Sequence, residues 1–461
     1  MASRFRFWLC LLVLLTSWAG GKTVQSEEPI SGWKAGRARA IITPQDAMWM
    51  AGYASRDRPA EGKLHELWAK VLVLEDAQQQ QAVLVSLDVI GTDRPFMQAI
   101  HGRVAERYDL SADQIALCAS HTHSGPVLKN NLSPLHYLVV DPEHQAQIEA
   151  YTAFLEDQIV ELVGEALESR VPVELTWGNG RAEFAVNRRN NRPEQDVPQL
   201  RAEGRLQGPS DHDVPVLAVH NQQGNLKAVV FGYACHATVL SGYEWSGDYP
   251  GYAQIELEQS HPGTQAMFWA GCGADQNPLP RRSVELARDY GKQLADAVQA
   301  VLNQARTPVV PRLVTQYQEV DLPFTELPTR EQLETDRQST NRFVAARAQL
   351  LLEQWDQQGG LADSYPYPVQ TWQLGEAIQF VSLGGEVVVD FALRLKSELR
   401  GGPTWVAGFA NDVMAYIASR RVLDEGGYEG GGAMLYYGLP TSWAPESEDL
   451  IVDEVHRQLA P

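Results

Sequence analysis

Apolar and polar positions follow one another in blocks that predict strands and helices in turn. Short apolar runs, typical of buried strands, lie at 68–74, 82–89, 115–119, 173–177, 228–234, 266–269, 378–383 and 404–409. Apolar residues spaced three or four positions apart predict helices at 95–108, 143–169, 252–259, 283–304, 330–357 and 388–399. The polar segment 187–208, with its Pro and Gly residues, is predicted to be a long surface loop. Strands and helices that alternate in this way predict an α/β (mixed α+β) fold, with a mixed β-sheet core flanked by helices.

Residues 1–28 are predicted to be a signal peptide rather than part of the fold. Arg4 and Arg6 precede an apolar run at 7–15, and small residues follow at 19–21. The run is shorter than the roughly 20 residues that a membrane-spanning helix needs. The alternative is a membrane anchor that is retained. We expect an exported protein, extracellular or periplasmic, whose folded part is 29–461.

The charge balance restricts the partners. The chain has 58 acidic and 38 basic residues and a formal net charge of -20, which disfavours nucleic acids and anionic membrane surfaces. Beyond the predicted signal peptide the cysteines are Cys118, Cys235 and Cys272. An odd number does not predict a disulfide framework, and we expect small buried side chains, although one pair could bridge.

Histidines stand at the ends of two predicted strands. His121 and His123 follow the strand at 115–119 and precede the turn Ser124-Gly125-Pro126, while His236 follows the strand at 228–234. Neutral imidazole is a common metal ligand, and residues at strand ends lie at the rim of a sheet, where a substrate has access. The alternative is that these are ordinary polar residues at strand ends. Two such motifs in one sheet protein favour a shared metal site.

Three further segments carry polar residues at turns. Asp248 opens a predicted helix, as a cap or as a carboxylate that orients an imidazole. The Gly-rich loop 270–278 lets the backbone approach a substrate but lacks the Gly-Lys-Ser/Thr of a phosphate loop. Glu386 lies between a strand and a helix, where a carboxylate also favours the helix dipole.

Taken in order, these motifs resemble those of the neutral (non-lysosomal) ceramidase family, in its catalytic domain. The matching segments are Ile42-Thr43-Pro44, Met50–Ala54, Ser120–Pro126, Val186–Arg188, Cys235–Thr238, Gly247-Asp248 with Gly251–Ala253, Gly384–Glu386, Asn411–Tyr416 and Tyr428-Glu429. Each motif alone is weak evidence for the family. The ordered set is specific to the family and covers most of the chain beyond residue 28. We therefore expect residues 29–461 to form a ceramidase-like zinc hydrolase catalytic domain.

The resemblance implies a ligand set and a chemistry. One catalytic zinc ion (Zn²⁺) would be held by His121, His236, Glu386 and Tyr416. The side chains that would line the substrate site around the scissile amide are His123, Arg188 and Tyr428. Zinc activates water and polarises a carbonyl, and these side chains would stabilise the oxyanion or protonate the leaving amine.

The chain departs from the family pattern at two places. Where ceramidases have Gly-Asp-Val-Ser-Pro-Asn, alignment on Gly273 puts Gln276 at the serine and Ala274 at the aspartate. Gln276 cannot act as a serine-like nucleophile, so we expect it, with Asp275, to bind substrate. The chain also ends at Pro461, and we expect it to lack the C-terminal β-sandwich domain of full ceramidases.

The sequence therefore predicts an exported zinc-dependent hydrolase that cleaves an amide bond, with an N-acyl lipid such as ceramide as the leading substrate. The alternatives are a zinc hydrolase of another small amide, ester or peptide, and a catalytically silent metal-containing binding protein. The expected partner is a small-molecule or lipid substrate, with no nucleic acid and at most transient contact with a membrane surface. No protein partner can be inferred.

Overall fold

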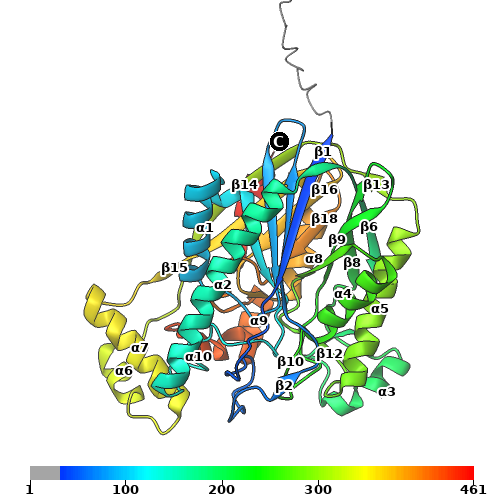
Figure 1. Ribbon diagram of the computed structural model, residues 1–461. Helices are drawn as coiled ribbons and strands as arrows, with labels where there is room; N and C mark the ends of the chain where they lie inside the picture. Colours follow the sequence, from blue (N-terminus) through cyan, green and yellow to red (C-terminus); the bar gives the residue numbers. More distant parts are fainter. Residues whose placement is uncertain (1–31, 461) are drawn as a thin grey trace, which may run out of the picture. The chain divides into compact units, whose positions relative to one another are not determined.

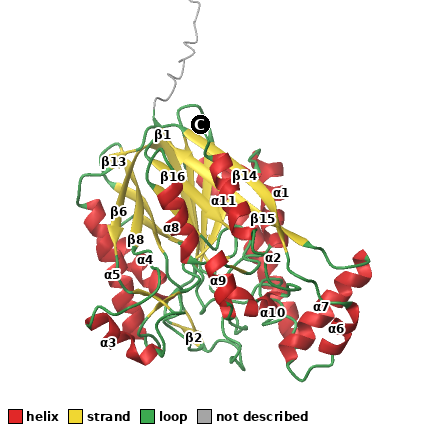
Figure 2. Cartoon of the chain, turned by 180° about the vertical axis from the view of Figure 1, so that it is seen from behind, coloured by secondary structure: helices red, strands yellow, loops and turns green. Residues whose placement is uncertain are grey.

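The computed structural model describes residues 32–460, so the predicted signal peptide at 1–28 lies outside the described residues. Within 32–460, none of the helices combines the length and the apolar character that a bilayer crossing requires. The described chain folds around two sheets with helices packed against them (Figures 1 and 2).

The larger sheet has nine strands in the order β11-β9-β8-β6-β1-β3-β4-β5, with β13 on β6. They are β1 (Trp33–Ile41), β3 (Trp68–Glu75), β4 (Gln81–Leu87), β5 (Ile115–Ala119), β6 (Val171–Arg181), β8 (Asp213–Asn221), β9 (Leu226–Tyr233), β11 (Gln265–Ala270) and β13 (Thr307–Pro308). The end pairs β4/β5 and β9/β11 are parallel, and the strands between them are antiparallel. The sheet is therefore mixed, as predicted.

The smaller sheet has the order β14-β15-β16-β18. Its strands are β14 (Leu313–Pro323), β15 (Ser364–Leu374), β16 (Ile378–Leu383) and β18 (Thr404–Ala407). The segment 407–411, just after β18, bonds to both edges of the larger sheet: the Ala119 amide donates to the Phe409 carbonyl (3.1 Å), and the Gly408 amide to the Ala270 carbonyl (3.0 Å). The carboxyl ends of β5, β11 and β18 consequently meet at one place.

Helices cover the sheets. They are α1 (Arg94–Tyr108), α2 (Pro142–Glu168), α3 (Val197–Ala202), α4 (Asp248–Ser260), α5 (Val284–Leu302), α6 (Arg330–Asp336), α7 (Arg342–Gln358), α8 (Val389–Glu398), α9 (Arg420–Glu425), α10 (Met434–Tyr437) and α11 (Ser447–Gln458). Helix α2 packs on β1 and β3, α5 on β6 and β8, and α11 on β14 and β15 (Figures 1 and 2). The sheets are thus flanked by helices, as the pattern of the sequence predicted.

Three two-stranded ladders lie at the carboxyl ends of the main strands. Strand β7 (Ala185–Asn187) pairs with β12 (Gln276–Pro278), and β2 (Gly62–Lys63) pairs with β10 (Glu244–Trp245). The third ladder joins β17 (Glu386–Val387) to β19 (Tyr416–Ile417) in parallel, with Glu386 opposite Tyr416. Pairing in these ladders gives the loop residues backbone partners and so holds them in place.

Two predicted elements differ from the structure. The helix expected at 330–357 is broken into α6 and α7, because the Asn341 side chain accepts from the Phe343 amide (3.0 Å) and starts a new helix. The loop expected at 187–208 contains the short helix α3. The expectation for the cysteines is confirmed: Cys118, Cys235 and Cys272 are buried and free.

Candidate active site

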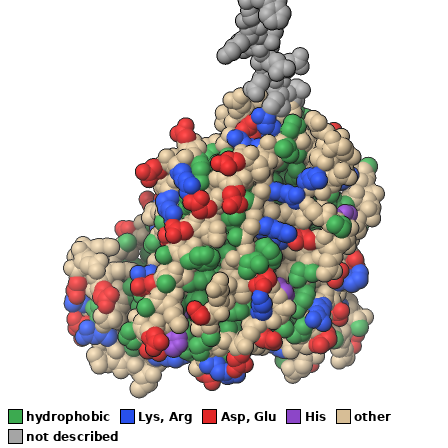
Figure 3. All heavy atoms as spheres, in the orientation of Figure 1, with side chains coloured by type: hydrophobic (Ala, Val, Ile, Leu, Met, Phe, Trp, Pro, Cys, Tyr) green, Lys and Arg blue, Asp and Glu red, His purple; other side chains and the backbone are tan. Residues whose placement is uncertain are grey.

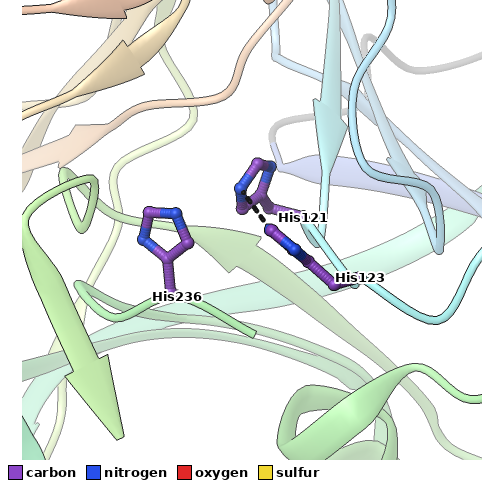
Figure 4. A group of neighbouring side chains, drawn as sticks. All are labelled: His121, His123 and His236. Atoms are coloured by element: carbon purple, nitrogen blue, oxygen red, sulfur yellow. Dashed lines mark hydrogen bonds between the residues drawn. The ribbon is translucent and has the colours of Figure 1, made fainter. Parts of the chain in front are cut away.

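Three histidines meet where β5 and β9 end. His121 and His123 follow β5 and His236 follows β9, and their ring nitrogens lie within 4.8 Å of one another. The Nε2 atoms of His121 and His123 are 3.1 Å apart, and Figure 4 shows the three rings gathered around one point. His121 and His236 are buried, whereas His123 is partly exposed. The sequence prediction that the two strand-end motifs share one site is therefore confirmed.

Backbone carbonyls fix the orientation of each ring. The Nδ1 contacts are His121 to the Ile90 oxygen (2.6 Å), His236 to the Gly273 oxygen (2.8 Å) and His123 to the Gly52 oxygen (3.0 Å). A carbonyl oxygen only accepts, so each Nδ1 must carry the hydrogen and donate it. Each Nε2 then presents a lone pair to the centre of the group, which is the arrangement of imidazoles that bind metals.

Glu386 completes this group from β17, which follows strand β16 of the smaller sheet. Its Oε2 lies 3.4 Å from Nε2 of His121 and 3.1 Å from Nε2 of His236, and it is a buried oxygen without a hydrogen-bond donor. The Tyr437 hydroxyl donates to the other oxygen, Oε1. Lone pairs that face each other without a hydrogen between them repel, so this arrangement calls for a cation at its centre.

The protonation states suit a cation as well. Burial and the charge of Arg188 lower the pKa of His236 to about 4. Burial and the neighbouring imidazoles lower the pKa of His123 well below its usual value. Burial alone would raise the pKa of Glu386, but His121 and His236 reverse this and hold it well below the usual range. His123 and His236 are thus neutral and Glu386 is ionised, the forms in which these groups bind metals.

A phenol and a guanidinium border the same centre. The Tyr416 hydroxyl lies 3.3 Å from Nε2 of His236 and accepts from Nη2 of Arg188 (3.0 Å). Nε of Arg188 donates to Glu429 (2.7 Å), and Nη1 donates to Asn277 (3.4 Å). Burial would lower the pKa of Arg188, but Tyr416 and Glu429 raise it above its usual value. Arg188 is therefore charged and fixed in position.

Comparison with known families identifies the group to which this arrangement belongs. The family described as neutral/alkaline non-lysosomal ceramidase, N-terminal, matches residues 33–349. The chain belongs to this family. Membership supports a hydrolase that acts on amide bonds, of the ceramidase type. The matched range includes the three histidines and Arg188, whereas Glu386, Tyr416 and Tyr428 lie beyond it.

Solved structures share the fold. Neutral ceramidase from Pseudomonas aeruginosa superposes with a TM-score of 0.69 at 18% identity, over 93% of this chain and 74% of that one. A ceramidase complexed with C2 superposes with a TM-score of 0.70 at 17% identity, over 92% and 74% of the two chains. A comparison with curated proteins found no match. The predictions of the family and of a mixed ceramidase-like fold are confirmed.

Tyr428 lies at the surface of this ceramidase-family site. Its ring centre is 5.3 Å from that of Tyr416, edge to face, and 43% of the residue is exposed. It is one of few large hydrophobic side chains so exposed in the described residues. The structure therefore places Tyr428 beside the ligand-like groups and open to an incoming molecule.

Asp275 and Gln276 are the two substrate-binding candidates in the Gly-rich loop. Both are fully buried. The Gln276 amide donates to the Pro209 carbonyl (3.1 Å), and the Asp275 carboxylate accepts from the Val389 amide (3.0 Å). The main chain of Gln276 accepts from the amide of His236 (3.0 Å), so the loop positions that histidine through its backbone. Binding of substrate by these two side chains stays a prediction.

Several residues that sequence reasoning missed support the site. Tyr437 orients Glu386, Asn277 contacts Arg188, and the Phe409 ring packs 4.4 Å from the ring of His121. Asn277 stands in the Gly-rich loop noted in the sequence, which was the one available signal. Phe409 is the last residue of the strand predicted at 404–409, whereas Tyr437 has no local pattern that marks it.

Asp248 acts on the backbone after His236 rather than on an imidazole. Its carboxylate accepts from the amides of Val239 (3.3 Å) and Leu240 (2.8 Å). Asp248 and His121 both adopt a left-handed backbone conformation, with φ of 56° and 58°. Such values cost free energy in residues other than glycine and are concentrated at functional sites.

Proposed function

We propose that this chain is an exported, zinc-dependent hydrolase that cleaves the amide bond of an N-acyl lipid such as ceramide. The observation that carries the proposal is the convergence of three imidazole Nε2 atoms and the unpartnered Oε2 of Glu386 on one point. Membership of the ceramidase family supports the amide as the bond that is cleaved.

The residues present fit a metal ion. His121, His236 and Glu386 would hold it, and Tyr416 would supply the fourth ligand, since its hydroxyl lies against His236. Imidazole nitrogen and carboxylate oxygen in a group of about four ligands are the donors that zinc prefers. A zinc ion bound there would supply an activated water and polarise the carbonyl of the amide.

Arg188 is the residue best placed to stabilise the oxyanion. Hydrolysis forms a C–O bond and breaks the C–N bond, and negative charge develops on the carbonyl oxygen between these steps. The guanidinium of Arg188 is always charged, is fixed by Glu429 and points Nη2 at Tyr416. It therefore needs no reorganisation and no proton change when that charge forms.

His123 is the best candidate to move the proton. Its Nδ1 hydrogen is committed to the Gly52 carbonyl, so its Nε2 is free to accept a proton from the attacking water and pass it to the leaving amine. It is also the only partly exposed member of the three histidines, which places it on the side of the substrate. Tyr428 is the alternative donor to the amine.

The test combines metal content with turnover. Purified protein is analysed for bound metals and then assayed on matched N-acyl amides and esters, including ceramide. The proposal expects about one zinc per chain and cleavage of an N-acyl amide. Turnover of small esters or peptides alone would favour another zinc hydrolase, and bound metal without turnover would favour a binding protein.

A further inference from the structure

The open side of the histidine group is bordered by Tyr53. His123 is the member of the group that is partly exposed, and the Tyr53 ring centre lies 5.0 Å from that of His123. The Tyr53 hydroxyl donates to the carbonyl of Leu240 (2.8 Å), which fixes the ring in place. Tyr53 therefore lies against the partly exposed histidine of the group.

Two arginines, Arg56 and Arg282, lie beside this tyrosine, and Arg342 contacts the next residue, Ala54; we call these three the arginine cluster. Arg282 donates to the Tyr53 hydroxyl (2.9 Å) and stands 5.1 Å from the ring centre. Arg56 stands 5.0 Å from the same ring centre. Arg342, the first residue of α7, donates to the carbonyl of Ala54 (3.4 Å). Three separate segments thus bring positive charge to one place.

The arginine cluster lacks acidic partners. Within residues 32–460, no carboxylate lies within 4.0 Å of any of its guanidinium groups, although two neighbours in sequence are paired: Arg58 with Glu61 and Arg281 with Glu194, both at 2.6 Å. Acidic residues outnumber basic ones by 58 to 38, and the two signs are mixed on the face shown in Figure 3. The three guanidinium groups of the cluster thus stand close to one another without a direct acidic partner.

The buried carboxylate of Asp248 senses the charge of Arg282, but it accepts from backbone amides and does not pair with any arginine of the cluster. Arg56 is only 4% exposed; its Nη1 donates to the Ala51 carbonyl and its Nη2 to the Gly242 carbonyl (3.0 Å), and its Nε has no hydrogen-bond partner. Burial lowers its pKa to about 10, and the charge of Arg282 adds to this effect. The nearby carboxylate of Asp57 is already bound by Arg58 (3.0 Å) and by the hydroxyl of Tyr243 (2.8 Å). Carbonyl groups hold Arg56 in place without cancelling its charge, so the cluster keeps a positive charge that favours an anion.

We propose that the substrate of this enzyme carries an anionic group next to the scissile amide, and that the arginine cluster binds it. The inference rests on the proposed amide hydrolase. Arg282 and Arg342 are exposed and can reach a ligand, and guanidinium groups bind carboxylate, sulfonate and phosphate through paired hydrogen bonds. A protein with net charge -20 repels anions overall, so local positive charge is needed to admit one. An anionic N-acyl amide fits this entrance better than uncharged ceramide.

The test compares substrates that share one acyl chain. N-lauroylglycine, N-lauroyltaurine and N-lauroyl phosphoethanolamine carry a carboxylate, a sulfonate and a phosphate, while N-lauroylethanolamine is uncharged. We expect kcat/KM to be at least about 10-fold higher for one or more of the anions. That preference should decline as NaCl rises from about 50 to about 300 mM, because salt screens exposed charges.

The variants are Arg282→Asn and Arg342→Gln. Asparagine tolerates the left-handed backbone of Arg282, whose φ is 93°, and Arg342 is exposed at a helix start, so the two substitutions carry different folding risks. Each should lower kcat/KM about 10-fold for the preferred anion and leave the neutral amide unchanged. The control is Lys227→Ala, which removes one positive charge at the opposite end of β9 from His236.

The outcomes separate the two proposals. Equal rates on anionic and neutral amides, or equal losses on both in the variants, would overturn the anionic substrate while leaving the amide hydrolase intact. If zinc-loaded protein turns over none of these amides, the proposed function itself fails. Zinc content and the melting temperature of each variant confirm that any loss arises from binding.

Discussion

The two halves of the site are built in different ways. The histidines stand at the ends of β5 and β9 in the larger sheet, each held by a backbone carbonyl. Glu386 and Tyr416 come from the ladder β17–β19, next to the smaller sheet, and are held by side chains. The histidine half depends on strand geometry, whereas the carboxylate half depends on the two sheets meeting at 407–411. Substitutions can show whether the two halves contribute equally to metal binding and to catalysis.

Removing a histidine should have the largest effect. His121→Ala or His236→Ala leaves at most two imidazole nitrogens to bind the metal. Bound zinc and activity should therefore be lost together. Metal analysis and kcat on an N-acyl amide check this. His456→Ala is the control, since that histidine is on α11 and contacts Glu398 (2.9 Å). Full zinc in both site variants would mean that the ligand assignment is wrong.

Arg188 contacts both halves of the site, and Arg188→Ala tests whether it stabilises the oxyanion. If Arg188 donates to that oxygen, kcat should fall by about 10²–10³ while zinc is retained. Because the pKa of Arg188 is raised and its charge does not change near neutrality, the pH at which kcat/KM rises should not move. The measurement is a pH–rate profile of wild type and variant. A shifted acid limb would contradict the role, and Arg188→Lys shows how much depends on charge alone.

His123→Ala separates a proton carrier from a metal ligand. As a proton carrier, its loss should lower kcat by about 10² with zinc still bound. As a third nitrogen ligand, its loss should release the metal, since Nε2 lies 3.1 Å from that of His121. Zinc content measured beside kcat decides between them. Because the pKa of His123 is lowered well below 6.5, the wild-type ring stays neutral over the whole neutral range.

Tyr437→Phe probes the carboxylate half. The substitution removes the hydroxyl that donates to Oε1 of Glu386 and leaves the ring that fills the space. Loss of such a supporting bond lowers metal affinity by about 10- to 100-fold, and we expect zinc affinity to fall by that amount. Competition with a chelator measures it. Tyr367→Phe is the control, because that buried hydroxyl donates to the Gly384 carbonyl (2.8 Å) rather than to Glu386. If Tyr437→Phe and Tyr367→Phe lowered zinc affinity equally, the cause would be a general loss of protein stability.

The same contrast explains how far the sequence predicts this site. Strand-end histidines follow from local pattern, because a short apolar run fixes where the next residues emerge. Glu386 and Tyr416 were predicted only through the resemblance to ceramidases, since their meeting with the histidines depends on contacts between distant segments. Tyr437 was missed for the same reason, 51 positions from its partner. The apolar runs also passed over β1, where polar residues interrupt the buried ones, and β14, most of whose residues are only partly buried.

Gln276→Ala should have the smallest effect and tests the place where the chain departs from its family. The side chain is fully buried and donates to the Pro209 carbonyl, and its Oε1 is unpartnered. Its backbone, which the substitution leaves in place, accepts from the amide of His236. If the side chain contributes only recognition, KM should rise by about 2- to 10-fold with kcat and zinc unchanged. Steady-state kinetics on the best amide substrate provide the measurement. A collapse of kcat with every substrate would place Gln276 in the chemical step, and a gain of ceramide hydrolysis in Gln276→Ser would link this position to the serine of the family loop.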